Sequence, residues 1–309
     1  MGSALPTLAF LGTVWGLTPA LAKLLVQGGW TPLTVATCMG TLSGAILLGI
    51  LFARGERLPL SRAYLRHYAA GGLFGLALPN FFSMTALQHV PAGFFAIVIP
   101  LSPLATVVVI ALLGMERMTT RRVVGTLAGL CGVALAMSPG AALPDLSLLP
   151  WALLIMLTPV CYAASNVLGV RLRPDGAPAL VLATGATVVG SALLWIATLL
   201  SGQFRPGPAN ALMLIPLLQG TMGALAFVVY FRSLARHGGV VTSQIGYLIT
   251  ITGLIWGFLL FGEVPGWLTI PAAALVFTGL ALVTLPGRRV SPAGAWVPSG
   301  RSPGAGPRH

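Results

Sequence analysis

The chain consists of long runs of apolar residues that are separated by short polar loops rich in proline and glycine. A helix needs about 20 mainly apolar residues to cross the hydrocarbon core of a bilayer, and the pattern predicts ten such spans. They cover residues 4–26, 33–53, 68–89, 92–113, 120–138, 148–171, 180–200, 211–236, 239–261 and 267–286. Residues 287–309 are rich in glycine, proline and serine, which predicts a disordered tail.

A shift of 147 positions places the first five predicted spans on the last five, so that Trp15 falls on Tyr162 and Thr37 on Thr184. Because five is an odd number, the second half must enter the membrane from the opposite side. The sequence therefore predicts two inverted five-helix repeats, over residues 1–139 and 148–286. Many secondary transporters have this architecture.

Composition supports an all-α membrane protein. Charged residues make up 7% of the 309 positions and apolar residues 56%, with a mean hydropathy of +0.93, whereas soluble domains are about 25% charged. A soluble enzyme and a nucleic-acid-binding protein are excluded on this ground. The expected partners are the lipid bilayer and a small-molecule substrate, and we expect a monomer. The three cysteines lie in separate apolar runs without metal-ligand spacing, so no metal or other cofactor is expected.

Basic residues predict the orientation of the chain. Of the 17 lysines and arginines, all but Lys23 and Arg205 fall on one side of the predicted spans. Cytoplasmic loops carry such an excess, so both termini and the tail are predicted to be cytoplasmic. The outer ends of three spans carry Trp30, Trp151 and Trp267, which we expect in the aromatic belt of the membrane interface.

No aspartate, glutamate, lysine, arginine or histidine is predicted at mid-depth. This absence argues against a carboxylate proton relay and against an arginine or lysine clamp for phosphorylated substrates. Lys23 and His89 are expected near the outer interface, the first snorkelling and the second wetted by solvent. Glu116 and Glu263 follow the fourth and ninth spans, where they are expected to stabilise loop turns or to pair with a nearby arginine.

The middle of the spans offers neutral polar groups, aromatic rings and proline-broken helices. Serine and threonine in membrane helices often bond only their own backbone, and that alternative stays open for each of them here. Proline removes a donor, so carbonyl groups freed by Pro79, Pro100 and Pro159 are expected to act as extra acceptors. The candidate substrate-binding residues are Trp15, Thr18, Asn80, Ser83, Ser102, Tyr162, Asn166, Tyr230 and Tyr247.

Two sequence stretches resemble a known family. The segment ALQHVPAGFFAIVIPLSPLATVVVIALLGMERMTTRRVVGTLAGLCGVALA resembles the EamA repeat of the drug/metabolite transporter superfamily, which has an AL…AG…SP…GE…G pattern. A second copy, from SLARHGGVV onward, keeps the GE and the later glycine but lacks the SP. The opening AFLGTVWGLTPALAK is similar to the family's WG-x-x-x-x-x-x-K start.

The resemblance implies a ten-helix transporter with a basket-like central cavity in the inner membrane of a bacterium. Trp15, Tyr162 and the phenylalanine-rich third span are most similar to the aromatic amino-acid exporters of that superfamily. We therefore expect a secondary exporter of aromatic or hydrophobic amino acids and related metabolites that works by alternating access, and not an enzyme. The alternative is an exporter of an uncharged metabolite or drug. A membrane-embedded enzyme is disfavoured, because the sequence lacks a metal cluster and a nucleophile–base pair.

Overall fold

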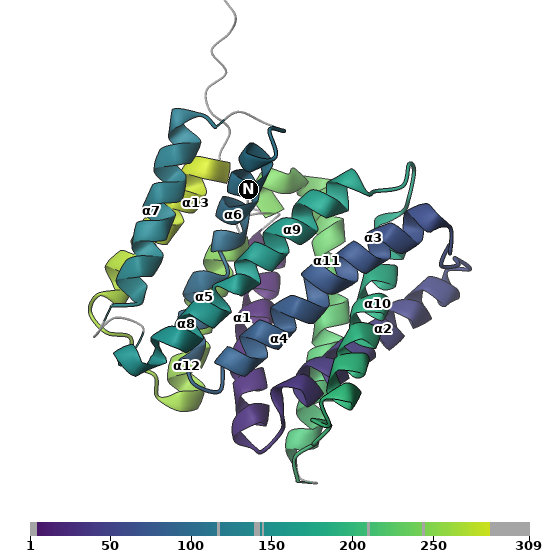
Figure 1. Cartoon of the computed structure of the whole chain (residues 1–309), viewed down its shortest axis with the longest axis horizontal. Coiled ribbons are helices and arrows are strands. Elements are labelled where there is room, and N and C mark those ends of the chain that lie inside the picture. Colours follow the sequence, from purple (N-terminus) through teal and green to yellow (C-terminus); the bar gives the residue numbers. More distant parts are fainter. Residues whose placement is uncertain are drawn as a thin grey trace, which may run out of the picture.

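The computed structural model describes residues 5–115, 118–138, 143, 145–208, 211–242 and 245–284, and every regular element in these ranges is a helix (Figure 1). The predicted tail and Glu116 lie outside the described residues. The helices are α1 (Leu5–Gln27), α2 (Pro32–Ala53), α3 (Arg62–Gly72), α4 (Leu78–Ala86), α5 (Ala92–Val98), α6 (Leu101–Leu112), α7 (Thr120–Ala136), α8 (Leu149–Ile155), α9 (Leu157–Arg171), α10 (Ala179–Leu200), α11 (Leu214–Thr242), α12 (Ile245–Phe261) and α13 (Thr269–Thr284). A π turn, η1 (Leu73–Ala77), joins α3 to α4, and the 3₁₀ turns η2 (Leu146–Leu148) and η3 (Ala211–Met213) precede α8 and α11.

Five helical segments are long and apolar enough to cross a membrane. They are α1, α2, α10, Ala92–Leu112 (α5 with α6) and Leu146–Arg171 (η2 to α9). Leu214–Tyr230 of α11, α12 and α13 are shorter apolar helices. These lengths and compositions are those of a multi-pass membrane protein.

One predicted boundary is wrong. We expected a loop between residues 236 and 239, but α11 continues to Thr242 and α12 begins at Ile245. The His-Gly-Gly sequence there looks like a helix end in a soluble protein. Glycine costs only about 1 kcal/mol in a helix interior, and membrane helices tolerate it well.

Three predicted spans are interrupted near a proline. The third contains the π turn directly before Pro79, the fourth breaks at Pro100, and the sixth breaks at Met156, three residues before Pro159. A proline cannot donate to the carbonyl group four residues earlier, and its ring crowds that turn. The interruptions lie inside the predicted spans, where the regular α-helical hydrogen-bond pattern is locally broken.

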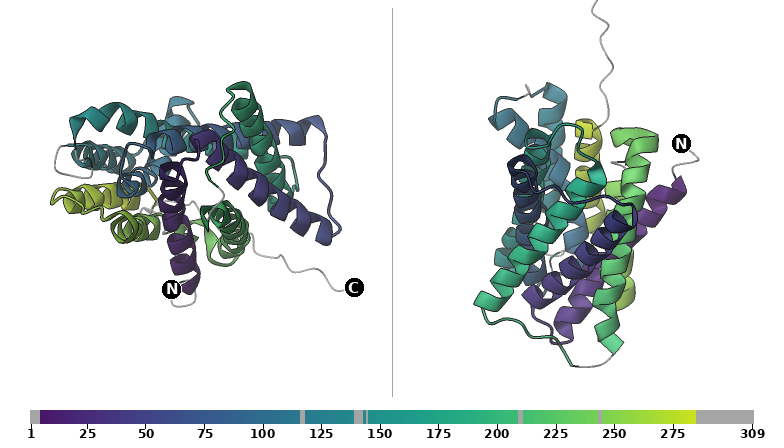
Figure 2. Two further views of the ribbon diagram at one scale, coloured as in Figure 1. Left: turned by 90° about the horizontal axis from the view of Figure 1, so that it is seen from below. Right: turned by 90° about the vertical axis from the view of Figure 1, so that its right-hand side faces the viewer.

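The main helix contacts join residues 1–139 to residues 148–286. At one end of the molecule α7 packs on α13, and at the other α10 packs on α2 and α3 (Figure 1). Between these ends, α1 packs on α12, α11 on α2, and α9 on α6. Figure 2 shows the helix bundle from two further directions. The largest buried cluster, which includes Phe94, Ile155 and Val276, therefore draws on both halves.

Glycines allow the closest of these contacts. A Cβ atom on Gly125 would lie 2.8 Å from the carbonyl oxygen of Gly279, and one on Gly279 would overlap the carbonyl oxygen of Gly125. The backbones of α7 and α13 thus touch directly, a common way for membrane helices to associate.

Candidate substrate site

Trp15 and Tyr230 of the candidate set lie together in an aromatic cluster. The Trp15 ring on α1 has its centroid 5.5 Å from that of Tyr230 and 6.0 Å from that of Phe227, both on α11. Phe227 and Tyr230 are three residues apart, which places them on one face of the helix. The sequence analysis missed Phe227, although its spacing from Tyr230 was a usable signal. We call Trp15, Phe227 and Tyr230 the aromatic cluster.

Ser102 and Asn166 are linked through a threonine. The hydroxyl of Thr106 donates to the carbonyl oxygen of Ser102 at 2.7 Å, and Nδ2 of Asn166 donates to Oγ1 of Thr106 at 3.1 Å. The bond joins α6 to α9, and the Asn166 side chain is exposed. The Asn166 side chain therefore contacts α6 through Thr106, which was not predicted, and Ser102 takes part only with its backbone carbonyl group.

Asn80 and Ser83 on α4 make local bonds. Nδ2 of Asn80 donates to the carbonyl oxygen of Leu76 in the π turn at 2.8 Å, and the hydroxyl of Ser83 donates to the carbonyl oxygen of Asn80 at 3.4 Å. Asn80 is half-buried and Ser83 is buried. These bonds tie both side chains to the broken part of the third span.

The other three predicted residues, Thr18, Tyr162 and Tyr247, lie apart from these groups and make contacts of their own. The Thr18 hydroxyl donates to the carbonyl oxygen of Val14, and the Tyr247 ring packs on Phe277 of α13 at 5.0 Å. Tyr162 is half-buried on α9, whereas the ring contacts of Trp15 are with α11. The structure thus does not stack the symmetry-related pair of Trp15 and Tyr162 on each other.

Gln219 on α11 is a polar residue that the candidate set omitted. Its side chain is 4% exposed, and Nε2 donates to the carbonyl oxygen of Thr18 at 2.9 Å. Its Oε1 is buried without a hydrogen-bond partner among the described residues. A buried amide oxygen without a donor costs free energy, so this atom is a candidate acceptor for a ligand. An isolated glutamine in an apolar run was the available signal.

One expected acceptor is already used. Pro100 leaves the carbonyl group of Ala96 without its helical donor, and the Thr250 hydroxyl of α12 donates to that oxygen at 2.8 Å. This hydrogen bond joins α5 to α12. The Ala96 carbonyl group therefore serves helix packing, contrary to its expected role as a substrate acceptor.

Lys23 and Glu263 form an ion pair, with 2.6 Å between Nζ and Oε1. Of the two expectations for Glu263, pairing with an arginine is therefore wrong. Lys23 has a protein partner as well as its expected place near the outer end of α1. The pairing partners are 240 residues apart in sequence, so no local pattern indicates the contact.

Of the three tryptophans predicted to lie in the aromatic belt, Trp30 and Trp151 pack against other parts of the protein. Trp267 is 79% exposed, as an interface residue should be, but Trp30 is 5% exposed. Trp151 stacks on His89 with ring centroids 3.8 Å apart, so His89 contacts an aromatic ring in addition to its predicted interface position. The belt prediction is wrong for Trp30, because the loop after α1 folds it back onto the bundle.

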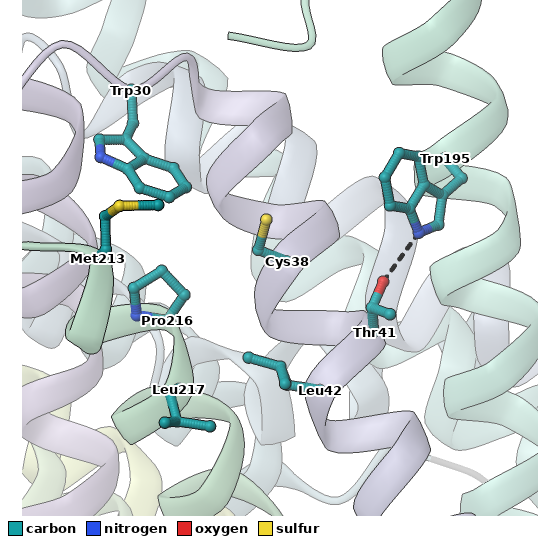
Figure 3. A pocket seen from close by; sticks show the side chains of 8 residues that line it. All are labelled: Trp30, Cys38, Thr41, Leu42, Trp195, Met213, Pro216 and Leu217. Carbon is teal, nitrogen blue, oxygen red and sulfur yellow. Dashed lines mark hydrogen bonds between the residues drawn. The ribbon is translucent and has the colours of Figure 1, made fainter. Parts of the chain in front are cut away.

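Trp30 lines a pocket of about 300 Å³ between α2, α10 and α11 (Figure 3). The other lining residues are Cys38, Thr41, Leu42, Trp195, Met213, Pro216 and Leu217. Nε1 of Trp195 donates to Oγ1 of Thr41 at 2.9 Å, so these two polar groups of the lining bond to each other. None of the predicted substrate-binding residues lines this pocket, and its lining is almost entirely apolar.

Comparison with known proteins identifies relatives along nearly the whole chain. The family model of the EamA-like transporter family matches residues 4–138 and again residues 149–285. An Escherichia coli K12 protein named "Uncharacterized inner membrane transporter YedA" is 28% identical over 294 residues, covering 91% of this chain and 90% of that protein. A Bacillus subtilis protein named "Uncharacterized transporter YyaM" is 30% identical over 225 residues, covering 72% of this chain and 71% of that protein.

A solved crystal structure has a similar fold. It superposes with a TM-score of 0.58 at 23% sequence identity, and the match covers 88% of this chain and 96% of the other. This likeness concerns the fold of the chain.

Proposed function

Because the chain belongs to the EamA-like transporter family, we propose that it is a secondary exporter of aromatic or other hydrophobic amino acids and related metabolites. Transport would proceed by alternating access through a central cavity. The observation that carries the proposal is the aromatic cluster on α1 and α11, combined with neutral polar groups on α4 at the positions equivalent to Phe227 and Tyr230.

The internal shift of 147 positions relates these two groups. It carries Trp15 to Tyr162 on α9, and it carries Asn80 and Ser83 on α4 to Phe227 and Tyr230 on α11. The two aromatic residues on α11 thus correspond to two polar residues on α4, and Trp15 corresponds to another aromatic residue; in inverted-repeat transporters the site lies between such halves. An amphiphilic ligand with a ring at one end and polar groups at the other fits such a pair of walls.

The reciprocal helix packing supports two inverted repeats. The first residues of α2 and α10, 32 and 179, and their last residues, 53 and 200, are both 147 positions apart. Contacts also come in related pairs, since α11 packs on α2 as α3 packs on α10. We therefore propose repeats over residues 1–139 and 148–286 with both termini in the cytoplasm. The chain would act as a monomer in a bacterial inner membrane.

The proposed binding mode uses dispersion and neutral hydrogen bonds. The ring of the substrate would pack against Trp15 and Tyr230, a contact that contributes about 0.5–1.5 kcal/mol per ring beyond area burial. The substrate ammonium group would donate to the unpartnered Oε1 of Gln219, which lies next to α1 through its bond to Thr18. Asn80 and Asn166 would supply amide donors for the carboxylate.

The alternative substrate is an uncharged planar metabolite or drug. The neutral amide of Gln219 and the rings of the aromatic cluster favour such a ligand as well, because neither group requires a charge on it. Competition between labelled phenylalanine and uncharged planar compounds separates the two.

An export assay in cells tests the proposal. Bacteria that express the chain are loaded with the toxic analogue p-fluorophenylalanine, and growth and intracellular analogue are measured. We expect improved growth and a lower intracellular level, and Trp15→Ala should reduce the protection. Trp267→Ala is the matched control, since that ring is 79% exposed and outside the aromatic cluster. Equal intracellular analogue with and without the chain would contradict the proposal.

A further inference from the structure

Lys23 and Glu263 form a charged pair that is largely withdrawn from solvent. Nζ of Lys23 lies 2.6 Å from Oε1 of Glu263, and the two side chains are only 11% and 17% exposed. Burying two charges costs free energy, which the pair recovers only with good geometry and further hydrogen bonds. The geometry of this pair meets both conditions.

Glu263 also binds the start of α5. Its Oε1 accepts from the backbone N–H of Ala92 and its Oε2 from that of Gly93, each at 3.0 Å. These groups have no partner within their own helix, because the first N–H groups of a helix lack acceptors. Gly257 makes room for the carboxylate, since a Cβ atom there would lie 2.7 Å from Oε2.

Lys23 has two further contacts at the same place. Its Nζ donates to the carbonyl oxygen of Val90 at 3.3 Å and lies 4.9 Å from the centroid of the Phe261 ring. A cation over an aromatic face gains about 0.5–2 kcal/mol. The ammonium group is therefore held by an anion, a carbonyl group and a ring.

The pair joins the two halves at one end of the bundle. Lys23 lies four residues before the end of α1, Ala92 begins α5, and Glu263 lies two residues beyond the end of α12. In the proposed topology, these three helix ends all lie on the outer side. Separating the outer ends of α1 and α5 from α12 requires this cluster to break, so the cluster resists that separation.

We propose that Lys23 and Glu263 are the outer gate of the transporter, and that breaking their contact sets the frequency with which the cavity opens outward. This inference rests on the proposed alternating-access function and deepens it. It assigns one joint role to residues that the sequence patterns present separately, the lysine of the WG-x-x-x-x-x-x-K start and the glutamate of the second GE.

Distances between spin labels test the gate. The three cysteines are replaced, and Gln27→Cys and Val264→Cys place labels on exposed residues at the outer ends of α1 and α12. Pulsed electron paramagnetic resonance then gives the distance distribution in proteoliposomes without substrate. The parent protein should show one narrow distribution. Lys23→Met and Glu263→Gln should each add a longer distance and raise the ratio of open to closed molecules at least tenfold, which corresponds to about 1.4 kcal/mol.

Three sets of variants complete the experiment. Lys23→Arg retains the charge and should retain the narrow distribution. The double variant Lys23→Met/Glu263→Gln buries no unpaired charge, so it carries the test if a single variant does not fold. Its shift should be smaller than the sum of the single shifts, because the residues act as a pair. Arg205→Met and Asp145→Asn remove exposed charges at the same proposed side and should leave the distances unchanged.

The outcomes distinguish a failure of the proposed gate from a failure of the proposed substrate assignment. Unchanged distances in well-folded Lys23→Met, Glu263→Gln and double variants would overturn the gate, and so would an equal shift in Arg205→Met. The measurement uses no substrate, so a failure of amino-acid export would not alter it. Intact export together with unchanged distances would overturn the gate alone.

Discussion

Removing the ring of Trp15 should weaken the recognition of aromatic substrates selectively. The Trp15 ring is half-buried and packs at 5.5 Å and 6.0 Å on the rings of Tyr230 and Phe227, which fix its orientation. A substrate ring on this cluster gains about 0.5–1.5 kcal/mol from Trp15 beyond area burial. Trp15→Ala should therefore raise the half-saturating phenylalanine concentration about twofold to tenfold, since 1.4 kcal/mol is a factor of ten.

The assay is uptake of labelled phenylalanine into proteoliposomes preloaded with unlabelled substrate, at a series of external concentrations. Alanine has no ring, so its half-saturating concentration should change less than twofold in Trp15→Ala. Trp15→Phe keeps a ring and should lie between the parent and Trp15→Ala. Trp267→Ala is the control. Trp30 is unsuitable for that purpose because it is 5% exposed and its removal would leave a cavity. An equal loss for phenylalanine and alanine would refute the reasoning and assign Trp15 to packing.

Three further predictions concern topology, packing and pH. A reporter fused after Arg289 should be cytoplasmic, and a cysteine at exposed Gln27 should react with an impermeant maleimide from outside; reaction only from inside would contradict the orientation. Gly279→Val should lower the free energy of unfolding by about 1–3 kcal/mol, because the valine side chain would collide with the α7 backbone. Gly49→Ala is the control, because a Cβ atom there meets open space and should not destabilise the protein. His67 lies just before the third predicted span, and burial and the nearby Arg173 hold its pKa below the ordinary value. The imidazole of the unfolded chain therefore binds a proton more tightly than that of the folded protein. The thermal midpoint should therefore fall as the pH drops through about 6.5, and His67→Gln should weaken that dependence.

The helix pattern could be predicted from the sequence because the bilayer fixes the length of each span. The boundaries of α2 and α10 lie within a residue or two of their predicted spans. The extension of α11 through His237 could not be predicted, because glycine and polar residues have different consequences in a membrane helix and in a soluble one. The π turn before Pro79 depends on packing as well as on the proline.

The residue types of the candidate site could be predicted from the sequence, but the contacts between those residues could not. Trp15 and Tyr230 were singled out as buried rings that need partners, yet their proximity depends on how α1 packs on α11. Gln219 acquires its role through its bond to Thr18 of a distant helix. The Lys23–Glu263 pair likewise joins opposite ends of the sequence, and helical periodicity carries no information on such pairings.

Counterflow of labelled phenylalanine is the most direct test of the central claim. Purified protein in liposomes loaded with unlabelled phenylalanine should accumulate external label transiently above the level of protein-free liposomes. Unlabelled tryptophan and tyrosine should compete, and threonine should compete less. No accumulation by well-folded protein, or competition only by uncharged planar compounds, would contradict the assignment as an aromatic amino-acid transporter.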